Sequence, residues 1–570
     1  MRVTQYATLV LVALACLPMA RAANPARDDL LKLVPPDTAV CLVVQGLRDR
    51  AKAIGESPFS TWVAEKFAPL VNASGDIQKI RDTEKILTTI LGISTADLRD
   101  ELLGDAIVLA YQPGPPGKPE AESGSILLKA RNPETLRKLI EKFNAAQKDG
   151  GELTEVVERT HRERTYQRRV KSNGKSEYYI LDGGLFVFAA QESAITAVID
   201  QQLAPADNVP RIAKAIADLG VADAFLVCWV NPRRLDAEIL AHANAAEEPK
   251  DRAAREQVRK LWSAVDQFAI YLDVHSDLEI GIAATYRADA MPPDWKNAFE
   301  AAPARSALWQ SIPDDAMFAI TGHATANQIV NLMLSFSPEA DKLSVRKEID
   351  KSLGAIIGKE KLPAVLSGIG PDIAIWVAKP NKGFLPAITM AVQVDATDPA
   401  VPVAVKKAVD FYAQFAQFEY NRKNDDAIEQ IDDNTGGWNV KSFANPKRFP
   451  PGVEPAYSMK DGYLLFGSSP AVVRSFVAPS KREKATAEVP LVRVSATAIR
   501  AYLKTHQTPV VQWLSEVQSR PVDDLQKELQ SLADILEAFD RIELVVRGNG
   551  QKIRLGLRVK FVQPLEKVTK

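Results

Sequence analysis

Histidines are the side chains of this chain best suited to acid–base chemistry or metal binding near neutral pH. The five are His161, His242, His275, His323 and His506. No two of them have the i, i+4 spacing of a metal-binding helix, and the sequence contains no Cys-x-x-Cys pair. We therefore interpret all five as surface or structural residues and predict no metal site.

Serine becomes a nucleophile only when a neighbouring base activates it. Ser344 with Lys347, and Ser172 with Lys175, have the Ser-x-x-Lys spacing of some acyl-transfer enzymes. The companion Ser-Asp-Asn and Lys-Thr-Gly motifs are missing from the sequence, as are a Gly-x-Ser-x-Gly elbow and a P-loop. We interpret both pairs as coincidences of spacing.

The acidic segment Asp432–Gly437 resembles part of a calcium-binding loop, because it offers oxygen ligands at alternate positions. The residue that would have to close such a loop as a glutamate is Phe443. Asp, Asn and Gly are also the usual residues of turns. The composition therefore favours a turn.

A strongly basic segment spans Arg159–Lys175. Alternation along two strands would place several of its cations on one face, where they could bind an anionic polymer or surface. The other interpretation is a solvated edge hairpin whose charges prevent unwanted strand pairing. We favour the edge hairpin, because the second half of the chain has no equivalent run of charge.

We predict no catalytic, cofactor-binding or metal-binding residues. The net charge is −1, from 71 basic and 72 acidic residues, which gives no sign of a nucleic-acid partner. Cys41 and Cys228 lie in apolar, strand-like runs and are expected to be buried thiols. A disulfide between them is the alternative in an oxidising compartment.

Residues 1–22 have the features of a signal peptide. Arg2 is followed by the apolar run Ala7–Met19 and then by the small-x-small site Ala20–Ala22. The apolar run is shorter than the roughly 20 residues of a membrane span, so we favour cleavage over an uncleaved anchor. Cys16 raises a lipoprotein alternative, which the residues around it disfavour. We therefore expect a protein exported to the periplasm, the cell envelope or the medium, with no transmembrane span in the mature chain.

The strongest signal in the sequence is an internal duplication, because six pairs of segments recur in the same order. Where residues of the paired segments match one to one, their separation lies between 266 (Gly104 to Gly370) and 278 (Val34 to Ile312). The pairs are Leu33–Ala39 with Ser311–Ala316, Leu103–Val108 with Ile369–Ala374, the loops from Gln112 and from Lys379, the strands from Ile126 and from Ile388, the helix starts Asn132-Pro133 and Asp398-Pro399, and Tyr179–Phe188 with Tyr457–Phe466.

The two predicted helices have equivalent apolar faces. Their positions are Leu136, Leu139, Ile140 and Phe143 in the first, and Val405, Ala408, Val409 and Tyr412 in the second. In each copy several strands come between successive helices. That pattern predicts an α+β fold of two tandem diverged copies, each a largely antiparallel or mixed sheet with helices packed on one face. The expected organisation is a first unit at 28–290, a linker at 291–304 and a second unit at 305–563.

Three segments carry a resemblance to a known family. Leu33–Ala39, Ser57-Pro58-Phe59 and Leu102–Ala106 resemble a large family of exported planctomycete-type bacterial proteins of unknown function. The resemblance is clearest over about the first 200 residues. It implies a secreted or envelope location and supplies no activity or site residues.

Export, duplication and the lack of a catalytic motif favour a non-catalytic protein of the envelope or periplasm. Such a protein would bind or scaffold an envelope protein or polymer. The alternative is a hydrolase that acts on extracellular polymer, with its site between the two repeats. A third class, a small-molecule carrier, would have an enclosed apolar pocket.

Overall fold

A computed structural model describes residues 24–55, 60, 85, 87–115, 118, 121–204, 211–244, 249–275, 277–480 and 488–562. The predicted signal peptide and the Ser57-Pro58-Phe59 motif lie outside these residues. The chain forms two compact α+β units. Of the described residues, unit 1 contains 24–242, 265–287 and 560–562, and unit 2 contains 243–264 and 288–559.

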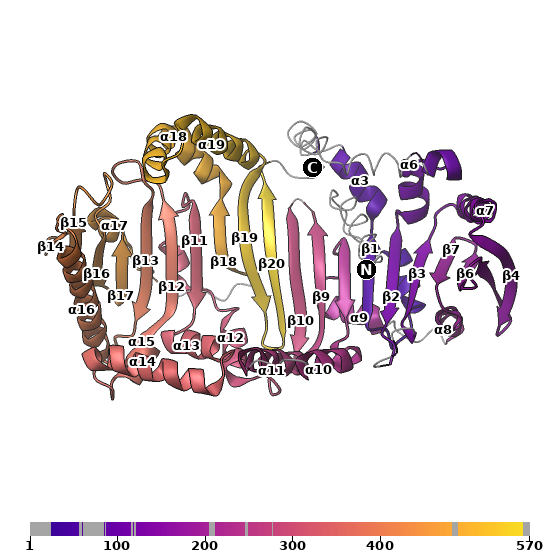
Figure 1. Ribbon diagram of the computed structural model, residues 1–570, viewed down its shortest axis with the longest axis horizontal. Coiled ribbons are helices and arrows are strands. Elements are labelled where there is room, and N and C mark those ends of the chain that lie inside the picture. Colours follow the sequence, from indigo (N-terminus) through magenta and orange to yellow (C-terminus); the bar gives the residue numbers. More distant parts are fainter. Residues whose placement is uncertain are drawn as a thin grey trace. The chain divides into compact units, whose positions relative to one another are not determined.

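The first strand of unit 1, β1, lies in the interior of the sheet, because it pairs with β2 on one side and with β8 on the other. The order across the described strands is β10-β9-β8-β1-β2-β3-β7-β6-β5-β4, and these pairings are antiparallel (Figure 1). The strands are β1 (Val40–Gln45), β2 (Ala106–Gln112), β3 (Ser123–Lys129), β4 (Leu153–His161), β5 (Arg164–Lys171), β6 (Ser176–Asp182), β7 (Leu185–Ala189), β8 (Leu226–Val230), β9 (Val265–Val274) and β10 (Leu278–Tyr286).

The sheet of unit 2 is built in the same way around β11. Its order across the described strands is β20-β19-β18-β11-β12-β13-β17-β16-β15-β14. The strands are β11 (Phe318–His323), β12 (Ile369–Ala378), β13 (Ala387–Val394), β14 (Glu429–Asp433), β15 (Val440–Ala444), β16 (Ala456–Lys460), β17 (Tyr463–Gly467), β18 (Val489–Ser495), β19 (Phe539–Gly548) and β20 (Lys552–Phe561).

The two strand orders become identical when ten is added to each label of unit 1. The register matches as well. Val40 pairs with Tyr111 in unit 1, and Phe318 pairs with Val377 in unit 2. The corresponding residues are 278 and 266 positions apart, which are the separations found between the repeated sequence segments.

Helices connect many of the strands in both units. In the first part of the chain they are α2 (Pro25–Lys32), α3 (Leu47–Gly55), α6 (Thr95–Asp97), α7 (Pro133–Asp149), α8 (Glu192–Gln202), α9 (Arg211–Asp218) and α10 (Asp236–Asn244). The same part contains the π-helices η1 (Leu87–Leu91) and η2 (Leu98–Leu103) and the 3-10 helix η4 (Pro232–Arg234). Unit 2 contains α11 (Pro249–Ala264), α12 (Pro293–Ala301), η5 (Ala307–Gln310), α13 (Ala326–Leu334), α14 (Glu339–Ile357), α15 (Leu362–Gly368), α16 (Ala400–Lys423), α17 (Pro470–Arg474), α18 (Ala496–Gln518) and α19 (Val522–Leu536).

The predicted helix starts are confirmed. The Asn132 side chain accepts a hydrogen bond from the Thr135 N–H at 3.1 Å, and Pro133 is the first residue of α7. The Asp398 carboxylate accepts from the Ala400 N–H at 2.9 Å, where α16 begins. A capping side chain satisfies an N–H that has no partner within the helix, so the Asn132 side chain caps α7. Helix α16 begins one residue later than its pattern predicts, because Pro399 is its N-cap rather than its first residue.

The core of unit 1 lies on one face of its sheet. Strand residues Val43, Val108, Leu127 and Val227 are fully or nearly fully buried there. Helices α2, α8 and α9 cover this face with residues that include Leu30, Leu31, Ile195, Ile199, Ile212 and Ile216. The central strands of unit 1 are therefore packed on this side as predicted.

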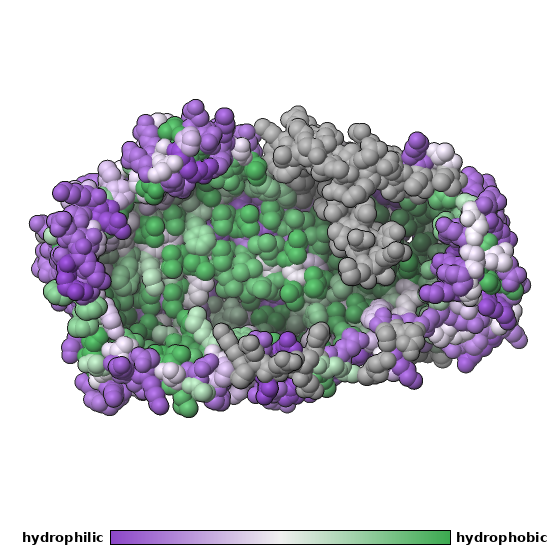
Figure 2. Space-filling model, viewed as in Figure 1, coloured by the Kyte–Doolittle hydropathy of each residue, from purple (hydrophilic) through white to green (hydrophobic). Residues whose placement is uncertain are grey.

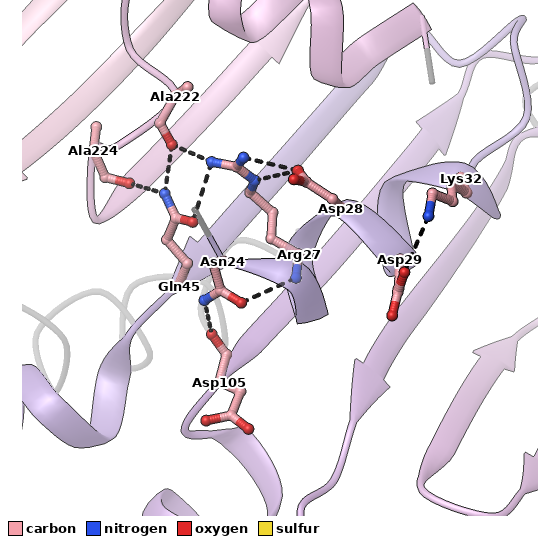
Figure 3. A network of polar contacts seen from close by, with 9 residues as sticks. All are labelled: Asn24, Arg27, Asp28, Asp29, Lys32, Gln45, Asp105, Ala222 and Ala224. Carbon is pink, nitrogen blue, oxygen red and sulfur yellow. Dashed lines mark hydrogen bonds and ion pairs between the residues drawn. The ribbon is translucent and has the colours of Figure 1, made fainter. Parts of the chain in front are cut away.

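A polar network fastens α2 to this core (Figure 3). Arg27 is 9% exposed, and its guanidinium donates to the Ala222 carbonyl oxygen and to Gln45 Oε1. Gln45 Nε2 donates to the carbonyl oxygens of Ala222 and Ala224 at 2.7 and 2.8 Å. Because buried polar groups are costly when unpaired, this network fixes the position of α2 on the sheet.

The core of unit 2 lies under η5 and α17. Its members include Leu308, Trp309, Ala319, Ala374, Trp376, Leu465, Val473 and Phe476. Helices are not confined to one face, however. Val401 and Val405 of α16 pack against Val394 and Leu464 on the opposite face, and α3 and α7 do the same at the margins of the unit 1 sheet. The prediction that helices pack on only one face of each sheet is therefore wrong in part. The second face is also apolar, and helices cover it near its edges.

Glu488 binds two arginines of unit 2. Arg547 Nε donates to it at 2.9 Å, and Arg558 donates at 2.7 and 2.8 Å. Partial burial would raise the pKa of Glu488, but the two arginines outweigh burial and hold that pKa below its usual value of 4.5.

Stability should therefore depend on the ionisation of Glu488. A lowered carboxyl pKa stabilises the folded chain above about pH 4.5, and this contribution is lost as the pH falls through the folded-state value. We expect Glu488→Gln to lower the free energy of unfolding at pH 7 and to flatten its decline below pH 5, measured by urea unfolding at a series of pH values. Glu339→Gln, which removes an exposed pair with Lys342, is the control and should change little. An unchanged pH profile in Glu488→Gln would contradict this role.

Candidate functional site

Three of the histidines each lie beside a different carboxylate. His161 lies 2.9 Å from Asp200, His275 lies 3.0 Å from Asp273, and His323 lies 2.8 Å from Asp372. The His506 ring packs beside that of Tyr502, and the His242 side chain is outside the described residues. Among the described residues, no group of three or more His, Cys, Asp or Glu side chains could hold a metal ion.

The Ser-x-x-Lys pairs lie at the surface. Ser344 and Lys347 are exposed on α14, and Ser172 and Lys175 are exposed in the turn between β5 and β6. A nucleophile needs a base held at hydrogen-bond distance in a site that excludes water. Exposed positions on a helix and in a turn offer no such shelter.

The Asp432–Gly437 segment consists of the last two residues of β14 and part of the turn that leads to β15. Gly436 and Gly437 have φ values of 62° and 73°, in the left-handed region that favours glycine. The Asp433 carboxylate accepts from the Thr435 N–H at 3.0 Å and pairs with Arg474. These contacts use the carboxylate within the fold, as expected for a turn.

The basic hairpin is partly neutralised by its own neighbours. Arg169 is buried and donates to Asn144 at 2.9 Å and to Glu177 at 2.6 Å. Lys171 pairs with the same glutamate, and Arg162 lies 3.2 Å from Asp200. Since β4 is the edge strand of its sheet, these contacts support a structural role for several of the cations.

The cysteines are free thiols on adjacent strands. Cys41 of β1 pairs with Trp229, and its neighbour Leu42 pairs with Cys228 of β8. Since successive side chains of a strand point to opposite faces, the two sulfurs lie on opposite sides of the sheet and cannot form a disulfide. Cys41 is buried in the core, and burial raises the pKa of its thiol.

The main surface feature of each unit is the sheet face that its core helices leave open. In unit 2, directly paired residues form two apolar rows across five strands. One row is Met390, Ile375, Ile320, Val492 and Leu544, and the other is Ile388, Val377, Phe318, Val494 and Ile542. Residues paired across antiparallel strands point to the same face, so we call these ten residues the apolar floor of unit 2.

The apolar floor is open to solvent. Ile388 is 50% exposed and Ile320 is 39% exposed. Helices α13 to α15 gather at one end of the strands and α18 with α19 at the other (Figure 1). Figure 2 shows the surface over β11, β12 and β13 as hollowed and apolar. An antiparallel sheet with a solvated face normally carries polar residues there, so this floor is suited to binding an apolar molecule.

Unit 1 has a matching row. Its residues are Ile126, Leu109, Leu42, Cys228, Ile270 and Ile282, paired in that order across six strands. Ile270 is 45% exposed and Ile282 is 50% exposed. Sequence reasoning placed these residues in strands but did not predict the open faces. The available signal was that runs such as Val40–Val44 are apolar at every position, which indicates two apolar faces.

Comparisons with protein families, curated proteins and solved structures found no match to this chain. Among the helices that the structure describes, none combines the length and the apolar character needed to cross a membrane.

Proposed function

We propose that this chain is an exported envelope protein that binds the acyl chain of a lipid, without catalysis, on the open apolar faces of its sheets. The observation that carries the proposal is the apolar floor of unit 2. Its ten side chains are aliphatic, aromatic or thioether groups, so none can form the directed hydrogen bonds by which sugars and peptides are recognised. A ligand that gains affinity there must do so by burying apolar surface.

The dimensions of the floor suit one acyl chain. Five strands about 4.8 Å apart span roughly 19 Å. An acyl chain extends across about half of a ~30 Å bilayer core, or ~15 Å, so it is short enough to lie across the floor. Burying about ten methylene groups at ~0.8 kcal/mol each would contribute about 8 kcal/mol before the cost of immobilising the chain. That value corresponds to micromolar binding at best.

A lipid fits this face better than a second copy of the same face. Two copies would meet through identical patches, and two hollowed surfaces placed opposite each other leave a void between them. Unfilled apolar space lacks the dispersion contacts that stabilise an interface. A flexible chain can follow the floor instead.

We also propose that the two units arose by tandem duplication of one α+β unit. The shared strand order and the register of Val40 and Tyr111 with that of Phe318 and Val377 support it. A signal peptide at 1–22 and membership of the exported planctomycete-type family remain part of this proposal. They would place the protein in an envelope that is rich in lipid.

The test is lipid binding by the chain that starts at Ala23. We expect lipid extracted from the purified protein to be identifiable by mass spectrometry, and the affinity for saturated fatty acids, measured by calorimetry, to rise with chain length. The double variant Ile320→Asp/Ile388→Asp should bind the longest-chain fatty acid at least tenfold more weakly, which equals about 1.4 kcal/mol. The reason is that two charges in the apolar floor disfavour an apolar ligand.

The control is Val477→Asp, at a 72% exposed position outside the sheet, which should bind as the unmodified protein does. Affinity that is independent of chain length, or equal in the double variant and the control, would contradict the proposal.

A further inference from the structure

Helix α16 carries a ridge of exposed aromatic rings. Phe411, Phe415 and Phe418 are 48%, 52% and 62% exposed. Their i, i+4 and i+7 spacing places them on one side of the helix, and the rings of Phe411 and Phe415 stack at 6.2 Å. Large apolar side chains gathered in this way on a solvent-exposed surface mark an interaction site.

A hollow of about 430 Å³ lies beside the ridge, toward the start of the same helix. It is lined by Ile356 of α14 and by Val403, Lys406, Lys407, Asp410, Phe411 and Gln414 of α16. The Asp410 carboxylate is anchored to the sheet. Lys441 of β15 lies 3.0 Å from it, and the Tyr457 hydroxyl of β16 donates to it at 2.8 Å. These contacts and the buried Val405 fix the helix, so the hollow has a defined shape.

We propose that α16 pairs antiparallel with α16 of a second copy of this chain. A twofold axis near Phe411 would place the second half of each helix against the first half of the other. Phe415 and Phe418 of each copy then enter the hollow beside Val403 of the other copy. The same contact forms twice, which is the self-complementarity that a twofold dimer requires.

The equivalent helix of unit 1 has lost or never acquired this surface. Helix α7 exposes Glu134, Lys138, Glu141 and Lys142 rather than a row of rings. Its one exposed ring, Phe143, lies under the Arg169 guanidinium at 5.1 Å. Since the two helices occupy equivalent places, neither the fold nor the core explains the ridge of α16.

The size of the surface suits a weak, transient dimer. At about 200 Å² per ring, the exposed parts of the three phenylalanines amount to roughly 300 Å². Two such ridges amount to roughly 600 Å², which is below the ~1,000 Å² at the lower end of specific interfaces and indicates weak, reversible association. A membrane is a poorer fit, because it inserts nothing into a hollow.

The test is sedimentation velocity of the mature chain from submicromolar to high micromolar concentration. The unmodified protein should show a reversible monomer–dimer equilibrium. Phe415→Ala/Phe418→Ala removes the inserted rings, and Val403→Trp fills the hollow. Each variant alone should raise the dimer dissociation constant at least tenfold. Val477→Trp adds the same ring at an exposed position outside α16 and is the matched control.

Mixing the two variants provides the decisive measurement. In a mixed dimer, the phenylalanines of the Val403→Trp chain enter the intact hollow of the Phe415→Ala/Phe418→Ala chain. The filled hollow of the Val403→Trp chain then faces only the alanines of its partner, so it causes no clash. The mixture should therefore recover dimer that neither variant forms alone. A monomeric wild-type protein at every concentration, unaltered association in the variants, or a mixture as monomeric as its components would each overturn the proposal.

Discussion

Replacing Trp376 by alanine is expected to lower the free energy of unfolding by about 3–5 kcal/mol. Trp376 lies on β12, is 4% exposed, and stacks on Phe476 with ring centroids 6.4 Å apart. Its removal would leave a cavity bounded by β strands that are fixed by their neighbours on both sides, so the surroundings cannot collapse into the space. The cost then contains both the lost transfer free energy and the cavity.

The measurement is urea unfolding followed by circular dichroism. Trp376→Phe, which keeps an aromatic ring in the core, should lose clearly less than the alanine variant. Val477→Ala removes an exposed side chain and should change stability by less than about 0.5 kcal/mol. A loss below about 1 kcal/mol in Trp376→Ala would mean that the core of unit 2 is not centred on this ring.

The second large effect is expected at the pair of His323 and Asp372. The Asp372 side chain is almost fully buried, and His323 Nδ1 lies 2.8 Å from its carboxylate. The carboxylate also raises the pKa of the Tyr463 phenol, after burial as the main cause. His323→Leu would leave a buried carboxylate without this partner, so we expect a loss of about 3 kcal/mol in the free energy of unfolding.

Two further variants separate a buried-charge effect from a packing effect. Gln45 stands at the equivalent end of β1 in unit 1, and His323→Gln keeps a donor, so its loss should be smaller. The double variant His323→Leu/Asp372→Leu removes both polar groups and should recover much of the stability. If the double variant is less stable than His323→Leu, the histidine matters through its volume and not through the carboxylate.

Local signals in the sequence were sufficient for much of the fold. The Asn132-Pro133 and Asp398-Pro399 pairs predicted two helix starts, because capping depends on a few adjacent residues. Strand segments such as Tyr179–Phe188 were recognised from two apolar runs on either side of a glycine turn. The class, α+β with antiparallel sheet, followed from the order of these elements.

Burial beyond the single element could not be predicted in the same way. Tyr412 was assigned to the apolar face of its helix, yet it is 40% exposed, whereas Val405 on that face is buried. The periodicity of a helix shows which residues share a side but not how far that side remains covered along the helix. The open floor was missed for the same reason, since an apolar residue such as Ile388 gives no sign of whether anything lies over it.

The place of the first strand within each sheet has a consequence for how the chain matures. Strand β1 must wait for β8, which begins at Leu226, and β11 must wait for β18, which begins at Val489. Pairings between such distant segments slow folding, because the loop must close before the contacts are gained. A nascent chain that cannot complete its central sheet early therefore stays unfolded for longer; if the chain is exported, as we propose, this delay would keep it in a state that can be threaded across a membrane.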